Sequence, residues 1–116
     1  MRRDRLKLLA DIAEAADSIQ DYTRHMTEDD YLANKAIRRA VEREFEIIGE
    51  ALRRISLSHP DLAARFPQAR DIVGFRNALA HGYDSVQDRR VWSTLTSDIP
   101  SLRAIVRRLA EEEAGA

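Results

Sequence analysis

Hydrophobic residues recur every three or four positions along most of this chain, which is the spacing of one face of an α-helix. The first such stretch predicts an amphipathic helix from about Asp4 to Arg24. A longer one follows Thr27-Glu28-Asp29-Asp30, a sequence suited to capping a helix N-terminus. We expect this second helix to span about 28 residues, or roughly 40 Å. The two stripes are Leu8, Ile12, Ala15, Ile19 and Tyr22, then Ile37, Val41, Phe45, Ile48, Leu52 and Ile55.

A short turn and a third helix are expected next. Ser58-His59-Pro60-Asp61 interrupts the long helix, and Asp61 is expected to cap a turn that Pro67 closes. The third helix is expected from about Gln68 to His81. Gly82 can adopt the left-handed conformation that ends it.

The last helix is expected to begin near Gln87 or Asp88. Because Pro100 falls within its repeat, we expect a kink or a short break near Asp98. The chain from about residue 111 to residue 116 is expected to fray. The stripe of this helix is Val91, Leu95, Ile99, Leu102, Ile105 or Val106, and Leu109.

These patterns predict an all-α fold, an antiparallel four-helix bundle with a short extra helical turn. A length of 116 residues suits one domain, 1–116, with a single core. Four glycines and three prolines leave few positions for the tight turns of an all-β protein.

Charge and cysteine content exclude several classes of protein. The formal net charge of −1 predicts no polyanion partner. Arginine makes up 17 of the 19 cationic residues, which suits phosphate binding, although a GC-rich genome produces the same bias. No cysteine is present for a disulfide or a thiolate metal site. No segment approaches the roughly 18 to 20 apolar residues of a membrane span, so we expect a cytoplasmic protein without membrane contact.

The stretch Arg76-Asn77-Ala78-Leu79-Ala80-His81-Gly82-Tyr83 has the spacing R-x4-H-x-Y. On a helix Asn77 lies one turn before His81, so its amide can orient the imidazole. Arg76 is about 140° from His81 around an ideal helix, so the two converge poorly on one small ligand. They can converge if Gly82 unwinds the helix end, or if a second copy of the chain supplies its own motif.

These groups fit RNA cleavage without a metal or other cofactor. A histidine can take the proton of a ribose 2′-OH or protonate the 5′ leaving oxygen, and an arginine can hold the scissile phosphate. The histidines His25, His59 and His81 are too widely spaced to suggest a metal site. Read on pattern alone, however, an arginine and a histidine at a helix end more often form a cap and a surface ion pair.

The chain resembles the HepT-type toxins of the HEPN superfamily over nearly its whole length. The resemblance rests on the R-x4-H-x-Y motif together with Ile48-Gly49-Glu50-Ala51 upstream, and Trp92 and Asp98-Ile99-Pro100 downstream. Many relatives carry a tryptophan shortly after the proline that precedes the motif helix. Here Pro67 is followed by Gln68 and Ala69, which we interpret as a change in local packing.

The resemblance implies a ribonuclease toxin that acts as a homodimer, with the two motifs facing a shared cleft. It implies Arg76, Asn77 and His81 as the catalytic residues and RNA as the substrate, with tRNA as one candidate. It also implies a minimal nucleotidyltransferase antitoxin, which can transfer AMP onto the motif tyrosine, here Tyr83. The added adenylate would obstruct RNA and occupy the arginine.

Three further residues are candidates for supporting roles. Glu50 could reach Arg76 and orient it, or it could be an ordinary exposed helix glutamate. Arg89 and Arg90 follow the motif closely and could contact RNA phosphates or the antitoxin.

Two alternatives to a ribonuclease stay open on the sequence. In one, the chain is the non-catalytic, nucleotide- or substrate-binding subunit of a two-component nucleotidyltransferase. In the other, it is a structural dimeric bundle whose motif only caps a helix.

Overall fold

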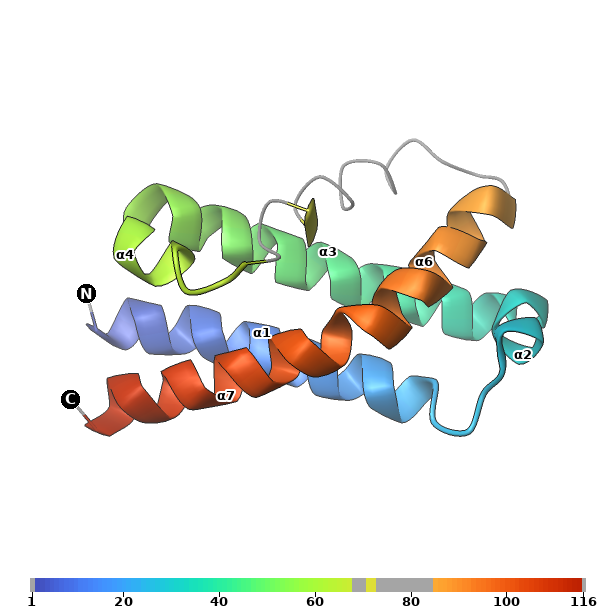
Figure 1. The fold of residues 1–116 in the computed structure, drawn as a ribbon, viewed down its shortest axis with the longest axis horizontal. Coiled ribbons are helices and arrows are strands. Elements are labelled where there is room, and N and C mark those ends of the chain that lie inside the picture. Colours follow the sequence, from blue (N-terminus) through green and yellow to red (C-terminus); the bar gives the residue numbers. More distant parts are fainter. Residues whose placement is uncertain (1, 68–70, 73–84, 116) are drawn as a thin grey trace.

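The structure, a computed structural model, describes residues 2–67, 71–72 and 85–115. The described residues form helices and connecting turns, and no strand occurs among them. The all-α prediction is therefore confirmed. The third expected helix, from about Gln68 to His81, lies almost entirely outside the described residues. The helices (Figure 1) are α1 (Arg2–Tyr22), α2 (Glu28–Ala33), α3 (Lys35–Ser58), α4 (Pro60–Ala63), α6 (Ser85–Ser97) and α7 (Ile99–Gly115).

Helix α1 packs against both α3 and α7, and these three helices form the body of the bundle. Both α3 and α7 run antiparallel to α1, so the two chain termini and α4 lie at the same end of the molecule (Figure 1). Helices α2 and α6 contact each other near the opposite end. The molecule measures 45 × 28 × 20 Å.

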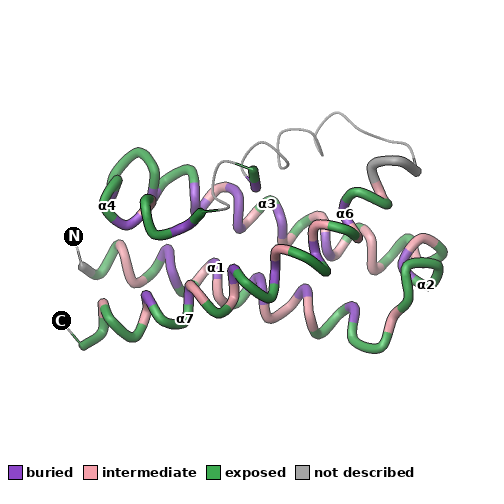
Figure 2. The backbone as a smooth tube through the Cα atoms, in the orientation of Figure 1, coloured by how far each residue is buried: buried purple, intermediate pink, exposed green. Residues whose placement is uncertain are grey.

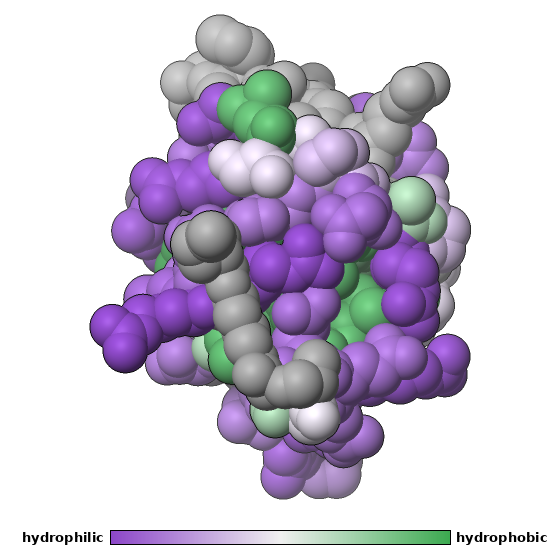
Figure 3. Space-filling view, turned by 90° about the vertical axis from the view of Figure 1, so that its left-hand side faces the viewer, coloured by the Kyte–Doolittle hydropathy of each residue, from purple (hydrophilic) through white to green (hydrophobic). Residues whose placement is uncertain are grey.

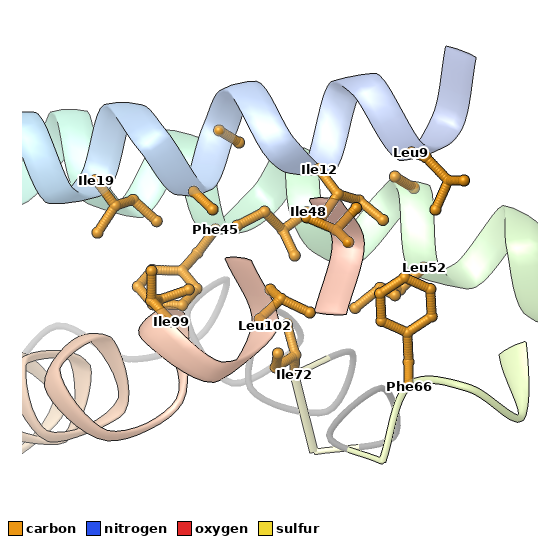
Figure 4. Close-up of a cluster of buried hydrophobic side chains, with 14 of the residues drawn as sticks. Leu9, Ile12, Ile19, Phe45, Ile48, Leu52, Phe66, Ile72, Ile99 and Leu102 are labelled. Atoms are coloured by element: carbon orange, nitrogen blue, oxygen red, sulfur yellow. The ribbon is translucent and has the colours of Figure 1, made fainter. Parts of the chain in front are cut away.

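The core contains most of the predicted stripe residues, and Figure 2 marks the buried positions along the chain. The buried side chains meet between α1, α3 and α7 (Figure 4). Ile37 of the second stripe is only partly buried, whereas Leu9, outside the predicted stripes, is completely buried. In the last helix Val106 is buried, whereas Ile105 only packs against the edge of the core. Tyr22 is an exception to the first stripe, because it is 37% exposed and donates a hydrogen bond to Glu44 (3.2 Å). The fully buried members include Ile12, Ile19, Val41, Phe45, Ile48, Leu52, Ile55, Val91, Ile99 and Leu102.

The expected long second helix is divided in two at Asn34. Thr27 caps α2 through a reciprocal pair of bonds with Asp30, as its sequence indicated. The backbone of Asn34 then becomes extended, and its side-chain oxygen accepts a hydrogen bond from the Ile37 N–H at 3.0 Å. Asparagine side chains compete in this way with helix continuation and favour caps. The single-helix prediction was wrong for this reason.

The short turn after α3 also differs from the expectation. Pro60 occupies the first turn of α4, and His59 is its N-cap without a side-chain capping bond. Asp61 does not cap the turn. Its carboxylate instead accepts two hydrogen bonds from the Arg5 guanidinium, at 3.1 and 3.0 Å. An ion pair between residues 56 positions apart cannot be read from local sequence.

The predicted break near Asp98 is confirmed, since α6 ends at Ser97 and α7 begins at Ile99. Helix α7 extends to Gly115, and the fraying expected from about residue 111 stays a prediction. Glu113 accepts from Arg5 at 2.7 Å and Glu112 from Arg65 at 3.2 Å. These pairs attach the last turns of α7 to α1 and to the turn that follows α4. The end of the molecule that holds them is largely hydrophilic (Figure 3).

Within the described part of the chain, no helix has the length and apolar character that a membrane crossing requires.

The turn that follows α1 contains a strained residue. His25 has φ of 65°, a left-handed conformation that glycine adopts readily and that other residues adopt at a cost. The turn is closed by a bond from the Met26 N–H to the Thr23 carbonyl (3.0 Å). Directly after α1, the Thr23 hydroxyl also donates a hydrogen bond to the Ile19 carbonyl (2.8 Å).

Replacing His25 with glycine should stabilise the protein by roughly 0.5–1 kcal/mol, because glycine removes the steric cost of the left-handed conformation. Urea unfolding of the wild type, His25→Gly and His25→Ala would measure the differences in the free energy of unfolding. Alanine retains the strain, so a His25→Ala protein at least as stable as His25→Gly would contradict this explanation.

Candidate functional site

The motif residues Arg76, Asn77, His81 and Tyr83 lie outside the residues that the structure describes. The described chain reaches the motif through Ile72, whose side chain is buried in the core beside Leu102 (Figure 4). It resumes after the motif at the start of α6. Along the sequence, the motif therefore lies between the buried residue Ile72 and helix α6.

Glu50 lies in the middle of α3 and forms ion pairs within its own helix. Its carboxylate accepts from Arg53 Nε (3.0 Å) and Nη2 (3.0 Å), and from Arg54 Nε (3.1 Å). The hydrogen bonds from Arg53, and then those from Arg54, lower the pKa of Glu50 to about 2. Glu50 is thus a fixed negative charge at any physiological pH. Its proposed contact with Arg76 stays a prediction.

A cleft opens beside Glu50 between α1 and α3, with a volume of about 290 Å³. Leu8, Ile47 and Ala51 supply its apolar lining. Its charged lining alternates in sign, with Asp11, Glu46 and Glu50 against Arg43 and Arg54.

Arg89 and Arg90 lie on the exposed side of α6, near its N-terminal end. The adjacent Asp88 forms an ion pair with Arg38 of α3 (3.5 Å). Arg38 in turn donates a hydrogen bond to the carbonyl of Leu32 in α2. These bonds hold the two candidate arginines at the junction of α2, α3 and α6.

An aromatic contact supports the same junction. Trp92 of α6 is half-buried, and its ring packs on Tyr31 with centroids 5.4 Å apart and an interplanar angle of 37°. Burial raises the pKa of the Tyr31 phenol above its usual range. No hydrogen-bond partner of this hydroxyl lies among the described residues. Trp92 is therefore a packing residue on this side of the molecule.

The structure does not bring all of the described candidates together. Asp88 fixes the start of α6 near Arg38, and Glu50 lies twelve residues further along α3. At 1.5 Å per residue these two points are about 18 Å apart along the helix. Glu50 therefore cannot share a small site with Arg89 and Arg90. An extended substrate could still lie along both Glu50 and the two arginines.

The arginines of the long helix are balanced by neighbouring carboxylates. Arg39 pairs with Glu42 (3.1 Å) and Arg43 with Glu46 (3.2 Å), in addition to the pairs of Glu50. Arginines along a long helix can follow an RNA backbone or form a solvated face balanced by carboxylates. The pairing favours the balanced face.

A histidine outside the motif has a structural role that spacing along the sequence did not indicate. His59 is 9% exposed, and its Nε2 lies 2.9 Å from Asp4 Oδ2. This hydrogen bond lowers the pKa of Asp4. It joins the start of α1 to the connection between α3 and α4. Among the described residues, no group of three or more His, Asp or Glu side chains could hold a metal ion.

Comparison with known proteins assigns the chain to a family. A family model described as "Ribonuclease HepT-like" matches residues 12–109, which includes the whole R-x4-H-x-Y stretch. The chain belongs to the HepT-like ribonuclease family. The resemblance inferred from the motifs is thereby confirmed.

Individual relatives agree with this assignment. A protein named "Probable ribonuclease HepT", from Thermococcus cleftensis, is 38% identical over 109 residues, covering 94% of this chain and 98% of the relative. The protein named "Putative RNase MJ1216", from Methanocaldococcus jannaschii, is 32% identical over 116 residues, covering 98% and 93%. No solved structure matches the chain significantly.

Replacing Glu50 with glutamine should lower the free energy of unfolding at neutral pH by less than about 1 kcal/mol, because the ion pairs are solvated. The folded-state pKa of about 2 is below the ordinary value of 4.5, so the contribution is present above pH 4.5. The difference between the wild type and Glu50→Gln should therefore shrink as the pH falls from 4.5 towards 2. Chemical unfolding of both proteins across this pH range measures the difference in their free energies of unfolding.

Glu111→Gln, at an exposed position on α7, is the matched control. A difference between wild type and Glu50→Gln that persists unchanged at pH 2 would show that Glu50 does not act through its charge.

Proposed function

We propose that this chain is a ribonuclease toxin that cleaves RNA through Arg76 and His81 without a metal ion. The observation that carries the proposal is the family match over residues 12–109, within which every residue of the R-x4-H-x-Y motif is present. Asn77 orients the imidazole, and Glu50 orients Arg76 from α3.

In the proposed reaction the substrate supplies the nucleophile. His81 accepts the proton of a ribose 2′-OH, and the 2′ oxygen attacks the adjacent phosphorus. The bond from phosphorus to the 5′ oxygen breaks, and that oxygen receives a proton. Arg76 stabilises the negative charge that develops on the phosphate oxygens. The products are a 2′,3′-cyclic phosphate and a 5′-hydroxyl.

The active unit in this proposal is a homodimer. On an ideal helix Arg76 and His81 are about 140° apart, so one motif alone encloses a phosphate poorly. Two motifs facing a shared cleft allow the arginine of one copy to complement the histidine of the other. Arg89 and Arg90, exposed on α6, then extend the positive surface towards RNA or an antitoxin.

A minimal nucleotidyltransferase antitoxin regulates the toxin in this proposal. The Tyr83 hydroxyl attacks the α-phosphorus of a nucleoside triphosphate such as ATP, loses its proton and releases pyrophosphate. The tyrosine retains AMP, whose phosphate lies two residues from His81 in sequence. The negative charge and the bulk together block entry of RNA.

Replacing Arg76 or His81 with alanine should reduce cleavage of a fluorescent RNA by at least about 100-fold, because each removes a group that acts only in the transition state. Activity of the wild type should survive EDTA. His25→Gly changes a histidine outside the motif and should retain full activity. A wild type that cleaves RNA only with added Mg²⁺ or Mn²⁺ would disprove the metal-free mechanism.

Co-expression with the proposed nucleotidyltransferase antitoxin should raise the mass of the chain by one or more adenylate units and restore growth. Tyr83→Phe lacks the acceptor hydroxyl, so it should keep the unmodified mass and remain toxic in the presence of the antitoxin. Intact-mass spectrometry with a growth assay measures both. A wild-type chain that is harmless alone and never modified would favour the non-catalytic binding subunit.

A further inference from the structure

Helices α6 and α7 form one bent helical path with a continuous exposed side. Helical hydrogen bonds cross the break, from the Asp98 N–H to the Thr94 carbonyl (2.8 Å) and from the Leu102 N–H to the Asp98 carbonyl (2.9 Å). Figure 1 shows the two helices following one another with a bend between them. Exposed residues spaced by three and four therefore continue from one helix to the next. We call them the α6–α7 row, which consists of Arg89, Ser93, Ser97, Pro100, Ala104 and Arg108.

Positive charge is concentrated in this part of the chain. Residues 89–110 contain five arginines and a single carboxylate, the half-buried Asp98, although the whole chain has a net charge of −1. Carboxylates resume at Asp88 on one side, which pairs with Arg38 (3.5 Å), and at Glu111 on the other. The five arginines are Arg89, Arg90, Arg103, Arg107 and Arg108.

One carboxylate from another helix reaches this cluster of arginines. Asp17 of α1 pairs with Arg103 and, at 3.3 Å, with Arg107. For Arg89 and Arg108, at the two ends of the row, no ion-pair partner lies among the described residues. The row therefore presents a net positive charge to solvent.

The surface between α1 and α3 has the opposite charge. Its two clefts, of about 290 and 350 Å³, are lined by five carboxylates against two arginines. A polyanion is therefore repelled from the α1–α3 side and attracted to the α6–α7 row. The net charge near zero conceals this separation. The carboxylates are Asp11, Glu14, Glu44, Glu46 and Glu50, and the arginines are Arg43 and Arg54.

We propose that the RNA substrate lies along the α6–α7 row, with Arg89 and Arg108 each binding a backbone phosphate. The proposal rests on the ribonuclease of the proposed function and specifies where its substrate binds outside the motif. A guanidinium binds phosphate through paired N–H donors, and serine hydroxyls also donate to phosphate oxygens, so Ser93 and Ser97 can contact the strand between the arginines. Phosphate contacts carry no sequence information, so binding is independent of base sequence.

The length and the position of the row suit a strand that also enters the motif. Arg89 and Arg108 are separated by at most about 28 Å along the helical path. Arg89 follows Tyr83 by six residues, so the chain itself limits the distance between their Cα atoms to about 22 Å. One RNA strand can therefore contact the row and the motif at the same time.

The first test removes the two terminal arginines of the row one at a time. Arg89→Gln and Arg108→Gln should each raise the Kd for a short single-stranded RNA by at least about threefold, because each removes one phosphate contact. The slope of log Kd against log salt concentration should also fall by about 0.7 in each variant. Fluorescence anisotropy over a salt series measures both quantities. The RNA probe carries 2′-O-methyl groups, so it lacks the attacking hydroxyl of the proposed reaction.

Arg43→Gln is the matched control. It removes the same charge from an exposed arginine of α3 that is paired with Glu46 (3.2 Å), so its Kd and salt slope should equal those of the wild type. A wild type that does not bind the probe would overturn the proposal. So would row variants that bind as the wild type does, or an equal loss of binding in Arg43→Gln.

An added arginine tests the row in a way that misfolding cannot imitate. Ser97→Arg places a cation midway along the row, at the C-terminal end of α6, where the helix dipole favours it. This variant should bind the probe more tightly and show a salt slope steeper by about 0.7. Ser56→Arg makes the same change at an exposed position of α3, outside the row. Equal tightening in both variants would show that net charge alone matters, and would also overturn the proposal.

Cleavage assays with the same proteins separate this proposal from the proposed function. A wild type that binds the probe along the row but cleaves no RNA would refute the ribonuclease and support the binding surface. Cleavage with a KM that neither Arg89→Gln nor Arg108→Gln raises would refute the binding surface and leave the motif chemistry standing. Row variants that keep RNA binding but no longer bind the antitoxin would assign the row to a protein partner, against the proposal.

Discussion

The burial of one side of α3 against α1 and α7 is the interaction on which the remaining structure depends. Phe45, Ile48 and Leu52 are completely buried, and they meet Ile12 from α1 and Leu102 from α7 (Figure 4). Burying side chains of this size contributes about 1.5–3 kcal/mol each. Every other described element is attached to this assembly, directly or through a connecting turn.

Ion pairs position the helix ends instead of supplying most of the stability. Arg5 joins α1 to both Asp61 and Glu113, and Asp4 joins α1 to His59. Such pairs near the surface are individually worth little, because water solvates both partners. Their geometry matters more, since it fixes α4, from which the chain proceeds to the motif. At the other end Arg38 fixes the start of α6, where the chain leaves the motif.

Local periodicity and residue chemistry were sufficient to predict the helical class, the buried stripes, the capping of α2 and the break at Asp98. Helix formation and capping depend on residues within one or two turns, which a sequence displays directly. The R-x4-H-x-Y motif indicated the family for the same reason, because the residues of the motif are close together in the sequence. The arrangement of Arg76, Asn77, His81 and Tyr83 lies outside the described residues and stays a prediction.

Only the tertiary structure decided which charges pair and which faces remain open. Asp61 was expected to cap a turn, but Arg5, 56 residues earlier, binds it instead. The same arginine reaches Glu113 and so joins α1 to the last turns of α7. Tyr22 belongs to a regular stripe and yet is exposed, because it lies beside Glu44 of α3. Contacts of this kind join residues distant along the chain, and packing of the helices alone determines them.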